Sequence, residues 1–451
     1  MDEITTFFWL FYAATPLAVA LLLAISGLSI FRFSIESFII IACYIYGFAG
    51  LPILYYQLDE SRVWYGITDQ NVILTMLLCG SWSLIGLCLG FFVSRFSKQL
   101  IGVHEYTKTS HTNNETLVLI IYLCICSLVL ALYISKLRNI PLFTAFGGDA
   151  KNAYLQRSES GNAFENYSRY SIFTRDVLPF VLFSSFSGYI INKNIKYILI
   201  FILSFTINTI ATLANGERSP LALTFIFLYI TFIFIRNNKY YFSKYIIIMS
   251  ILSISTIYFM FYIFSSEGTS YISILSSISG RTLTGQISPA YFYINFFPAH
   301  QDFLSGLSLP NPGGLLPYTP YRITYEVWAW AFPELARQGI VGSMPTIFWA
   351  EAYANFGYAG VMLAPVLIGI WASALSIALG AIRQTPMTVG FIIWAAVHFQ
   401  NLAGAGLSQF ILDFRLMLVG GLFVFGRIVS QSLGSRSTTS HMNSVSKPSK
   451  I

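Results

Sequence analysis

The sequence predicts an all-α polytopic membrane protein with about eleven transmembrane helices and a long, partly helical loop on the periplasmic face. Three observations predict this class. The 451 residues are 55% hydrophobic and only 10% charged, whereas soluble domains carry about 25% charged residues. Apolar residues occur in long uninterrupted runs, close to the roughly 17–25 residues that span a bilayer. Lys and Arg residues concentrate in alternate loops between these runs.

The apolar runs give the elements in chain order. The first run follows acidic residues and is longer than the core of a signal peptide, so we expect it to be retained as a helix. Residues 1–429 then form one membrane domain, and the Ser/Thr-rich tail at 430–451 is predicted to be disordered. The candidate spans are residues 7–30, 35–56, 71–93, 116–135, 171–191, 195–213, 219–235, 245–264, 359–381, 387–404 and 408–429.

The basic residues also orient the chain in the membrane. On one face, the short loops carry only Arg62 and Arg218. The positive-inside rule therefore predicts that this face is outside, together with the N-terminus, and that the C-terminus is cytoplasmic. The outer face then also carries residues 136–170 and the long, aromatic-rich loop at 265–343. The basic residues of the cytoplasmic loops are Arg32, Arg95, Lys98, Lys108, Lys193, Lys196, Arg236, Lys239, Lys244 and Arg383.

Composition and motifs exclude several functions. The net charge of +7 is scattered over loops and forms no basic stripe, so nucleic-acid binding is not expected. The five cysteines all fall inside apolar runs, which favours small packing residues over a disulfide framework. No phosphate-binding loop, dinucleotide glycine pattern or metal-ligand spacing is present, so we expect no cofactor. His300 and His398 show no partner by spacing and are interpreted as structural.

The first of four polar constellations is the turn Asn215-Gly216-Glu217-Arg218-Ser219-Pro220. Pro220 is suited to the first turn of a helix, which places Arg218 at a helix N-terminus near the membrane interface. Free backbone N–H groups and a guanidinium together form a phosphate site. The alternative is an interfacial arginine that reaches water or pairs with Glu217.

Two further constellations are charged residues in apolar surroundings. Arg281 follows the end of a helix in a weakly charged loop, and Arg322 and Arg337 come later in the same loop. We expect at least one of these arginines to bind a ligand. The pair Arg175-Asp176, with Arg169 just before it, lies in an apolar run and either binds a ligand or forms a structural ion pair.

The fourth constellation is Glu351, a single acid among aromatic residues, followed by Asn355-Phe356-Gly357. A carboxyl group in a medium of low dielectric suits proton transfer. The alternative is a glutamate whose hydrogen bonds hold an interfacial helix in place. The aromatic residues of the long loop either form an interfacial belt or stack on sugar rings.

These features resemble the oligosaccharide repeat-unit polymerases, the O-antigen or capsule polymerases of bacterial inner membranes. The resemblance covers most of residues 1–430 and depends on the architecture and on short motifs. The His-bearing motif of the related O-antigen ligases has no counterpart here. The motifs are Gly216-Glu217-Arg218, Arg281 with Tyr291 downstream, and the stretch from Pro345 through Glu351-Ala352-Tyr353 and Asn355-Phe356-Gly357 to Gly360.

The resemblance implies a glycosyltransferase that needs neither metal nor nucleotide. A hydroxyl of one lipid-linked repeat unit would attack the anomeric carbon of a glycan on undecaprenyl diphosphate, which leaves. The implied partners are lipid-linked glycans, membrane lipids and a chain-length regulator, with no nucleic acid. The implied roles are diphosphate or glycan binding by Arg218, Arg281, Arg175, Arg322, Arg169 and Tyr291, and base catalysis by Glu351 or, as the second candidate, Asp176.

Two alternatives remain open, a flippase or transporter of lipid-linked oligosaccharides and an O-antigen ligase. Transporters often show repeated halves with polar or broken helix segments near the midplane of the membrane. In this sequence the candidate ligand groups lie toward one face and no internal repeat is visible, which favours an enzyme.

Overall fold

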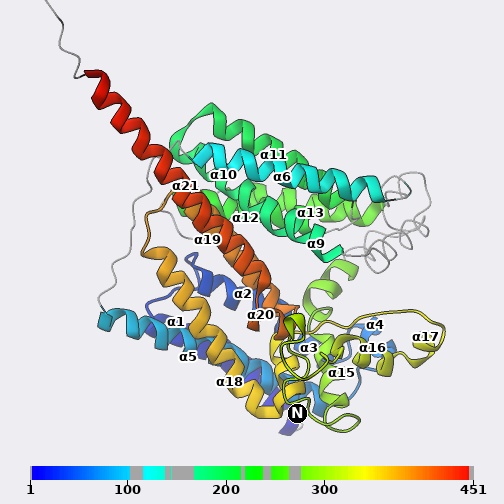
Figure 1. The fold of residues 1–451 in the computed structure, drawn as a ribbon. Coiled ribbons are helices and arrows are strands. Elements are labelled where there is room, and N and C mark those ends of the chain that lie inside the picture. Colours follow the sequence, from blue (N-terminus) through cyan, green and yellow to red (C-terminus); the bar gives the residue numbers. More distant parts are fainter. Residues whose placement is uncertain are drawn as a thin grey trace, which may run out of the picture. The chain divides into compact units, whose positions relative to one another are not determined.

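The computed structural model describes residues 3–101, 115–137, 144, 167–214, 219–236, 245–263 and 276–445. Within these residues the regular structure is helical and contains no β-strand (Figure 1). The prediction of a helical chain with several helices long and apolar enough to span a membrane is therefore confirmed for these residues, while the total of eleven spans and the periplasmic position of the long loop stay predictions. Two shorter apolar helices lie at Pro220–Ile235 and Tyr245–Phe259. Six helical stretches of the described chain are long and apolar enough to cross a membrane, namely Glu3–Ile25, Ile35–Tyr55, Gln70–Gln99, Glu115–Lys136, Ile195–Ala214 and Phe348–Gly380.

The chain forms two compact units, each assembled from segments that are distant in sequence. The prediction of one membrane domain over residues 1–429 does not distinguish these units, because apolar runs of similar composition do not indicate the unit to which they belong. Unit 1 comprises Met1–His104, Tyr271–Ala378 and Ala396–Asp413, and unit 2 comprises Glu105–Ser270, Leu379–Ala395 and Phe414–Ile451.

Long helices with closely packed backbones form the frame of unit 1. Along the contact between α5 and α18, a Cβ atom on Gly90 would lie 2.3 Å from the carbonyl oxygen of Val366, and one on Gly369 would lie 2.4 Å from that of Leu87. Small residues thus let the two backbones approach, as is common between membrane helices. The long helices of this unit are α1 (Glu3–Ile25), α2 (Ile35–Gly47), α5 (Gln70–Ile101) and α18 (Phe348–Gly380).

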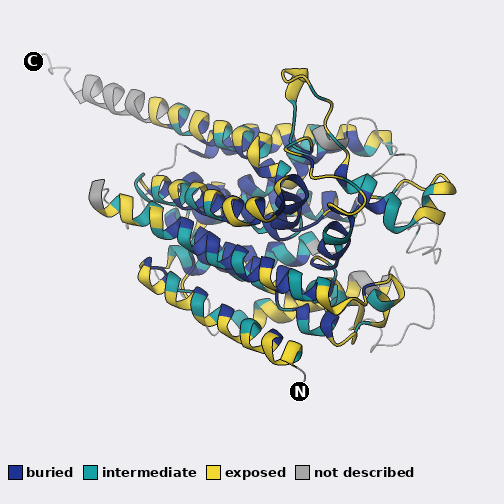
Figure 2. Cartoon of the chain, turned by 90° about the horizontal axis from the view of Figure 1, so that it is seen from below, coloured by how far each residue is buried: buried dark blue, intermediate teal, exposed yellow. Residues whose placement is uncertain are grey.

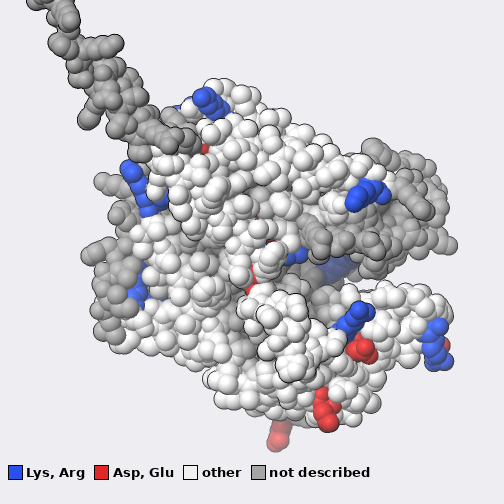
Figure 3. All heavy atoms as spheres, viewed as in Figure 1, with Lys and Arg blue, Asp and Glu red and all other residues white. Residues whose placement is uncertain are grey.

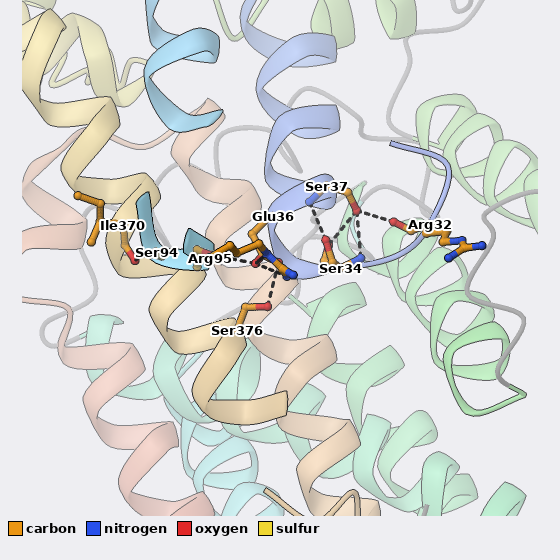
Figure 4. Close-up of polar contacts among 9 residues, drawn as sticks. Arg32, Ser34, Glu36, Ser37, Ser94, Arg95, Ile370 and Ser376 are labelled. Carbon is orange, nitrogen blue, oxygen red and sulfur yellow. Dashed lines mark hydrogen bonds and ion pairs between the residues drawn. The ribbon is translucent and has the colours of Figure 1, made fainter. Parts of the chain in front are cut away.

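One end of this frame is joined by a buried carboxylate (Figure 4). Glu36, at the start of α2, is fully buried. Its Oε1 accepts hydrogen bonds from Nε and Nη2 of Arg95 at 3.2 and 2.8 Å and from Ser373 Oγ at 3.1 Å, and its Oε2 accepts one from Ser376 Oγ at 2.8 Å. A buried charge with this many donors is compensated, and it ties α2, α5 and α18 together.

The opposite end of unit 1 joins the 57–69 loop to residues 276–297. Asp59 Oδ2 accepts a hydrogen bond from Thr284 Oγ1 at 2.6 Å, and the Tyr291 hydroxyl accepts one from the backbone N–H of Asp69 at 3.1 Å. Because α5 begins at Gln70, this end lies about 38 Å along the helix from Arg95, at 1.5 Å per residue. The two loops that the charge pattern assigns to one face of the membrane therefore share one end of unit 1.

The long loop is folded and partly helical. Between its helices, residues 298–322 and 338–347 are irregular except for short turns at 297–300, 305–308 and 338–339 and a single 3-10 turn at 312–314. Its elements, with those that precede and follow it in unit 1, are α3 (Leu51–Tyr55), α4 (Glu60–Trp64), η2 (Gly280–Thr284), α15 (Ser288–Phe296), η3 (Pro312–Gly314), α16 (Ile323–Ala331), α17 (Pro333–Arg337), η4 (Asn401–Ala403) and α20 (Ser408–Ile411).

Unit 2 is likewise held by a buried carboxylate at a helix end. Glu115, at the start of α6, accepts hydrogen bonds from the backbone N–H of Met387 at 2.9 Å and from Arg427 Nη1 at 3.4 Å. The elements of the unit are α6 (Glu115–Lys136), α9 (Tyr167–Ile172), η1 (Phe173–Val177), α10 (Leu178–Asn192), α11 (Ile195–Ala214), α12 (Ser219–Ile235), α13 (Ile246–Ile263) and α21 (Phe414–Val445), with the first part of α19 (Pro386–Gln400).

The helix α21 continues beyond residue 429, the end of the last predicted span. It runs to Val445, into the tail that was predicted to be disordered from residue 430. The physical reason is that the tail contains no proline before Pro448, so no residue forces the helix to end earlier.

The surface carries few charges and many apolar side chains. Figure 2 shows exposed residues along the helices as well as on the loops, and the face drawn in Figure 3 bears only scattered Lys, Arg, Asp and Glu. On α1, Leu17 is 73% exposed and Leu21 is 63% exposed. Such apolar exposure on a long helix is expected where lipid replaces water as the solvent.

Candidate functional site

The candidate site is built on the first turns of α18. Gly357 has φ 61° and ψ −148°, a conformation that favours glycine, and it separates the segment at 348–356 from the rest of the helix. Within that segment Glu351 and Asn355 are one turn apart and therefore share a face. Both side chains are buried, with exposures of 2% and 0%.

The carboxylate of Glu351 joins three distant parts of unit 1. Its Oε1 accepts a hydrogen bond from Ser308 Oγ at 2.6 Å. Its Oε2 accepts two from Ser408, one from the backbone N–H and one from the hydroxyl, both at 3.1 Å. A Cβ atom on Gly406 would lie 1.7 Å from Oε2, so only glycine allows this approach. These hydrogen bonds compensate the burial of the carboxylate.

Asn355 extends the same network to the loop at 304–308. Its Nδ2 donates to Ser308 Oγ at 2.8 Å, and its Oδ1 accepts from the backbone N–H of Gly306 at 3.1 Å. Its carbonyl oxygen also accepts from the N–H of Ser305 at 2.8 Å. Glu351 and Asn355 therefore fix both the loop at 304–308 and the turn at 406–408 on α18.

Tyr293, on α15, is a buried tyrosine whose hydroxyl group interacts electrostatically with the carboxylate of Glu351. Burial and then the negative charge of Glu351 raise the pKa of Tyr293 well above its usual value. The hydroxyl donates a hydrogen bond to the carbonyl oxygen of Met344 at 3.1 Å. Tyr293 is therefore a neutral donor at physiological pH and is not suited to act as a base.

The arginines predicted in the long loop lie at the surface of unit 1. Arg281 is exposed in η2, a π-helical turn, and Arg322 is exposed just before α16. Tyr291 differs from them because it is 6% exposed and its hydroxyl accepts backbone N–H groups of Thr68 and Asp69. In this structure Tyr291 anchors the 57–69 loop.

The remaining predicted residues belong to unit 2 or fall outside the described residues. Asp176, in the π-helical turn η1, is buried and pairs with Arg415, with Nη1 to Oδ2 at 3.1 Å. The neighbouring Arg175 is exposed. Arg169 belongs to α9, but its side chain is not among those described, and Arg218 lies wholly outside the described residues.

Sequence reasoning missed one polar pair of unit 1. His398, interpreted above as a lone structural histidine, pairs through Nε2 with Oδ2 of Asp413, and both residues are buried. The two residues are 15 positions apart and the chain between them passes through η4 and α20, so no helical spacing reveals the pair. The sequence feature that could have indicated this pair is that Asp413 is the only acidic residue after Glu351.

A metal site would need several ligand side chains close together among the described residues. Among them, no three His, Cys, Asp or Glu side chains gather closely enough to hold an ion. The groups of unit 1 that offer chemistry are therefore the buried carboxylate of Glu351 with its serine donors, the buried imidazole–carboxylate pair of His398 and Asp413, and the exposed guanidinium groups of Arg281 and Arg322.

Comparison of the chain with protein-family models, with curated proteins and with solved structures finds no match. The fold and the site define a class, a helical membrane protein whose long loop is anchored on a buried carboxylate.

Proposed function

We propose that this chain is a lipid-linked oligosaccharide polymerase of a bacterial inner membrane. It extends surface polysaccharide at the outer face. A hydroxyl oxygen of one lipid-linked repeat unit bonds to the anomeric carbon of the growing glycan. The bond from that carbon to undecaprenyl diphosphate breaks, and the hydroxyl proton passes to a base of the protein. The lipid diphosphate leaves with the bonding electrons.

The observation that carries this proposal is how the long loop is attached to unit 1. The loop presents the exposed Arg281 and Arg322 and is fixed, through Ser308, to the buried Glu351. A rigid anchor holds surface guanidinium groups in a defined position, and a guanidinium stabilises the charge that develops on a leaving diphosphate. Arg218, Arg175 and Arg169 are further candidates for binding the lipid-linked substrates.

Two groups of unit 1 are candidates for the base. Glu351 is the base candidate that the sequence predicts. Its two oxygens accept three hydrogen bonds, an arrangement that is compatible both with support of the loop and with proton transfer. The imidazole–carboxylate pair of His398 and Asp413 is the second candidate, since a carboxylate orients an imidazole that accepts a proton. Asp176 of unit 2 pairs with Arg415, an ion pair that suits a structural role better than that of a base.

The decisive experiment is extension of a purified lipid-linked repeat unit by the purified chain, without metal or nucleotide. We expect a ladder of products, which Arg281→Ala shortens to single repeats. Arg337→Ala is the matched control, because Arg337 is exposed on the same loop and its guanidinium pairs with the exposed Glu334. No extension by folded wild-type protein, or an unchanged ladder from Arg281→Ala, would contradict the proposal.

A deletion strain separates the alternatives. Loss of a polymerase leaves a single repeat unit at the cell surface. Loss of a flippase leaves none, and loss of a ligase leaves polymer that is not attached to the lipid core.

A further inference from the structure

We infer that residues 310–320 of the long loop, named here the leucine tip, insert into the lipid bilayer at the boundary between headgroups and acyl chains. The tip exposes two adjacent leucines, Leu315 at 83% and Leu316 at 52%. Its partner is the bilayer in which the chain is embedded.

Charge supports this partner. No charged residue occurs between Asp302 and Arg322, so the whole tip and its two flanks are neutral. An exposed leucine in water forgoes about 1.5–3 kcal/mol of burial free energy, and here two stand together at the apex of a loop. A loop that is exposed to water would be expected to carry charged or small polar residues at its apex.

Several backbone groups of the tip form hydrogen bonds within the tip, which lowers the cost of placing them in a medium of low dielectric. The side chain of Asn311 accepts a hydrogen bond from the N–H of Leu316 at 2.9 Å and donates to the carbonyl oxygens of Leu316 and Tyr318 at 2.8 and 2.6 Å. The N–H of Gly314 donates to the Asn311 carbonyl at 3.2 Å, and that of Tyr318 donates to the Leu316 carbonyl at 2.8 Å.

Prolines remove further donors from the tip. Pro310, Pro312, Pro317 and Pro320 have no N–H group. An unsatisfied backbone group costs several kilocalories per mole in lipid and almost nothing in water. Several of the tip's backbone groups are thus paired or absent and its leucines are outside, an arrangement that matches the requirements of lipid better than those of water.

The base of the tip adjoins the lipid-facing side of α18. The N–H of Tyr321 donates to the Leu307 carbonyl at 2.8 Å, which closes the tip onto the preceding loop. A Cβ atom on Gly306 would lie 3.6 Å from the ring of Phe356. Phe356 is the first of a run of exposed apolar residues on α18 that continues through Met362, Leu363, Leu367 and Trp371. The apolar surface of the helix thus continues onto the loop that carries the tip.

The test places a small fluorophore, bimane, on Leu315→Cys in the full chain reconstituted into liposomes. Cys124→Ser is the background, because Cys124 is exposed whereas the other four cysteines are buried. Thr319→Cys is the matched control, since Thr319 is an exposed polar residue of the same tip. Quenching is measured with doxyl groups at shallow and deep positions of the lipid chain, and with iodide in the water.

At Leu315→Cys we expect stronger quenching by the shallow doxyl group than by the deep one, because interfacial segments reach about 5–10 Å below the headgroups. We also expect iodide quenching about threefold lower than at Thr319→Cys. Equal iodide access at the two sites without doxyl quenching would overturn the inference. So would iodide protection that appears only as the protein-to-lipid ratio rises, because that would identify a second copy of the chain as the partner.

Asn311→Ala provides a second, independent readout. Added to the bimane-labelled Leu315→Cys protein, it leaves the label and Leu316 in place but removes three hydrogen bonds to the backbone of the tip. Iodide quenching at Leu315→Cys should then rise toward the Thr319→Cys value. Unchanged quenching would show that pairing of the backbone does not decide where the tip lies.

Discussion

Ser408 donates two hydrogen bonds to the same carboxylate oxygen of Glu351, one from its backbone and one from its hydroxyl, both at 3.1 Å. The two residues are 57 positions apart in the sequence, and the glycine at 406 is what lets them meet. Three hydrogen-bond donors point at this buried carboxylate, so residue 351 needs a side chain whose oxygens can accept all three hydrogen bonds.

Glu351→Gln should destabilise the protein and impair any activity that needs the long loop in place. The new amide group would present a donor to Ser308 or to Ser408, which already donate. We expect a loss of about 1–3 kcal/mol in unfolding free energy, the usual penalty for an unsatisfied buried group. Glu334→Gln is the control, because Glu334 is 72% exposed.

Thermal unfolding and glycan extension, measured together, separate the two roles of Glu351. Ser308→Ala removes one hydrogen bond to the carboxylate but keeps its charge. If Glu351 only supports the loop, Ser308→Ala and Glu351→Gln reduce extension to similar degrees. If Glu351 is the base, Glu351→Gln abolishes extension while Ser308→Ala retains most of it.

Arg95→Ala should be among the most destabilising substitutions in unit 1. It leaves Glu36 as a buried charge with only hydroxyl donors, and breaking such a pair costs about 3–5 kcal/mol. Adding Glu36→Gln should restore much of the stability, because the charge is then gone. A double-mutant cycle on the thermal unfolding midpoint tests this, and strict additivity of the two changes would contradict the coupling.

Gly90→Ala should push α5 and α18 apart. A Cβ atom at this position would lie 2.3 Å from the Val366 carbonyl oxygen, a backbone atom that cannot move alone. We expect a loss of about 1–3 kcal/mol. Gly421→Ala is the control, since no heavy atom lies within 4 Å of its Cβ position, and it should be neutral or slightly stabilising. Equal unfolding midpoints for the two variants would refute the close helix contact.

The link between Asp59 and Thr284 should weaken in acid. Burial opposes the charged form of Asp59, but hydrogen bonds from Ser61 and Thr284 and the charge of Arg62 outweigh it and hold the pKa of Asp59 below its usual value. The stabilisation is therefore complete above the unfolded-state pKa and is lost as pH falls through the lower, folded-state pKa.

The pH experiment compares wild type with Asp59→Asn. The difference in their unfolding midpoints should shrink as the pH falls from about 6 to about 3, because protonation removes the charge that the substitution also removes. A difference that stays constant over this range would contradict a role for the charged form.

Asp413→Asn should separate a catalytic role of the His398 pair from a structural one. An asparagine keeps a hydrogen bond to the imidazole but cannot stabilise its charged form. A base role predicts loss of extension and a shifted pH–rate profile with the unfolding midpoint nearly unchanged. A structural role predicts a lower midpoint and an unshifted profile.

Several features of the site were visible in the sequence because they are local. Glu351, Asn355 and Gly357 were singled out together in one short stretch, and the structure has a helix through the first two and a left-handed glycine at the third. Arg281 and Arg322 were singled out by the scarcity of charge around them, and both are exposed on the folded long loop. Their partners were not visible, because Ser308 and Ser408 are ordinary residues until the loops bring them together.

The amino-acid sequence by itself determined that this is a helical membrane protein, since a run of apolar residues long enough to cross a bilayer must satisfy its backbone internally as a helix. Tertiary structure alone decided which charges meet. Glu36 with Arg95, Asp176 with Arg415 and His398 with Asp413 are pairs of this kind. The physical reason is that helix formation depends on neighbours three or four residues away, whereas these contacts depend on how separate helices pack and how the loops between them close.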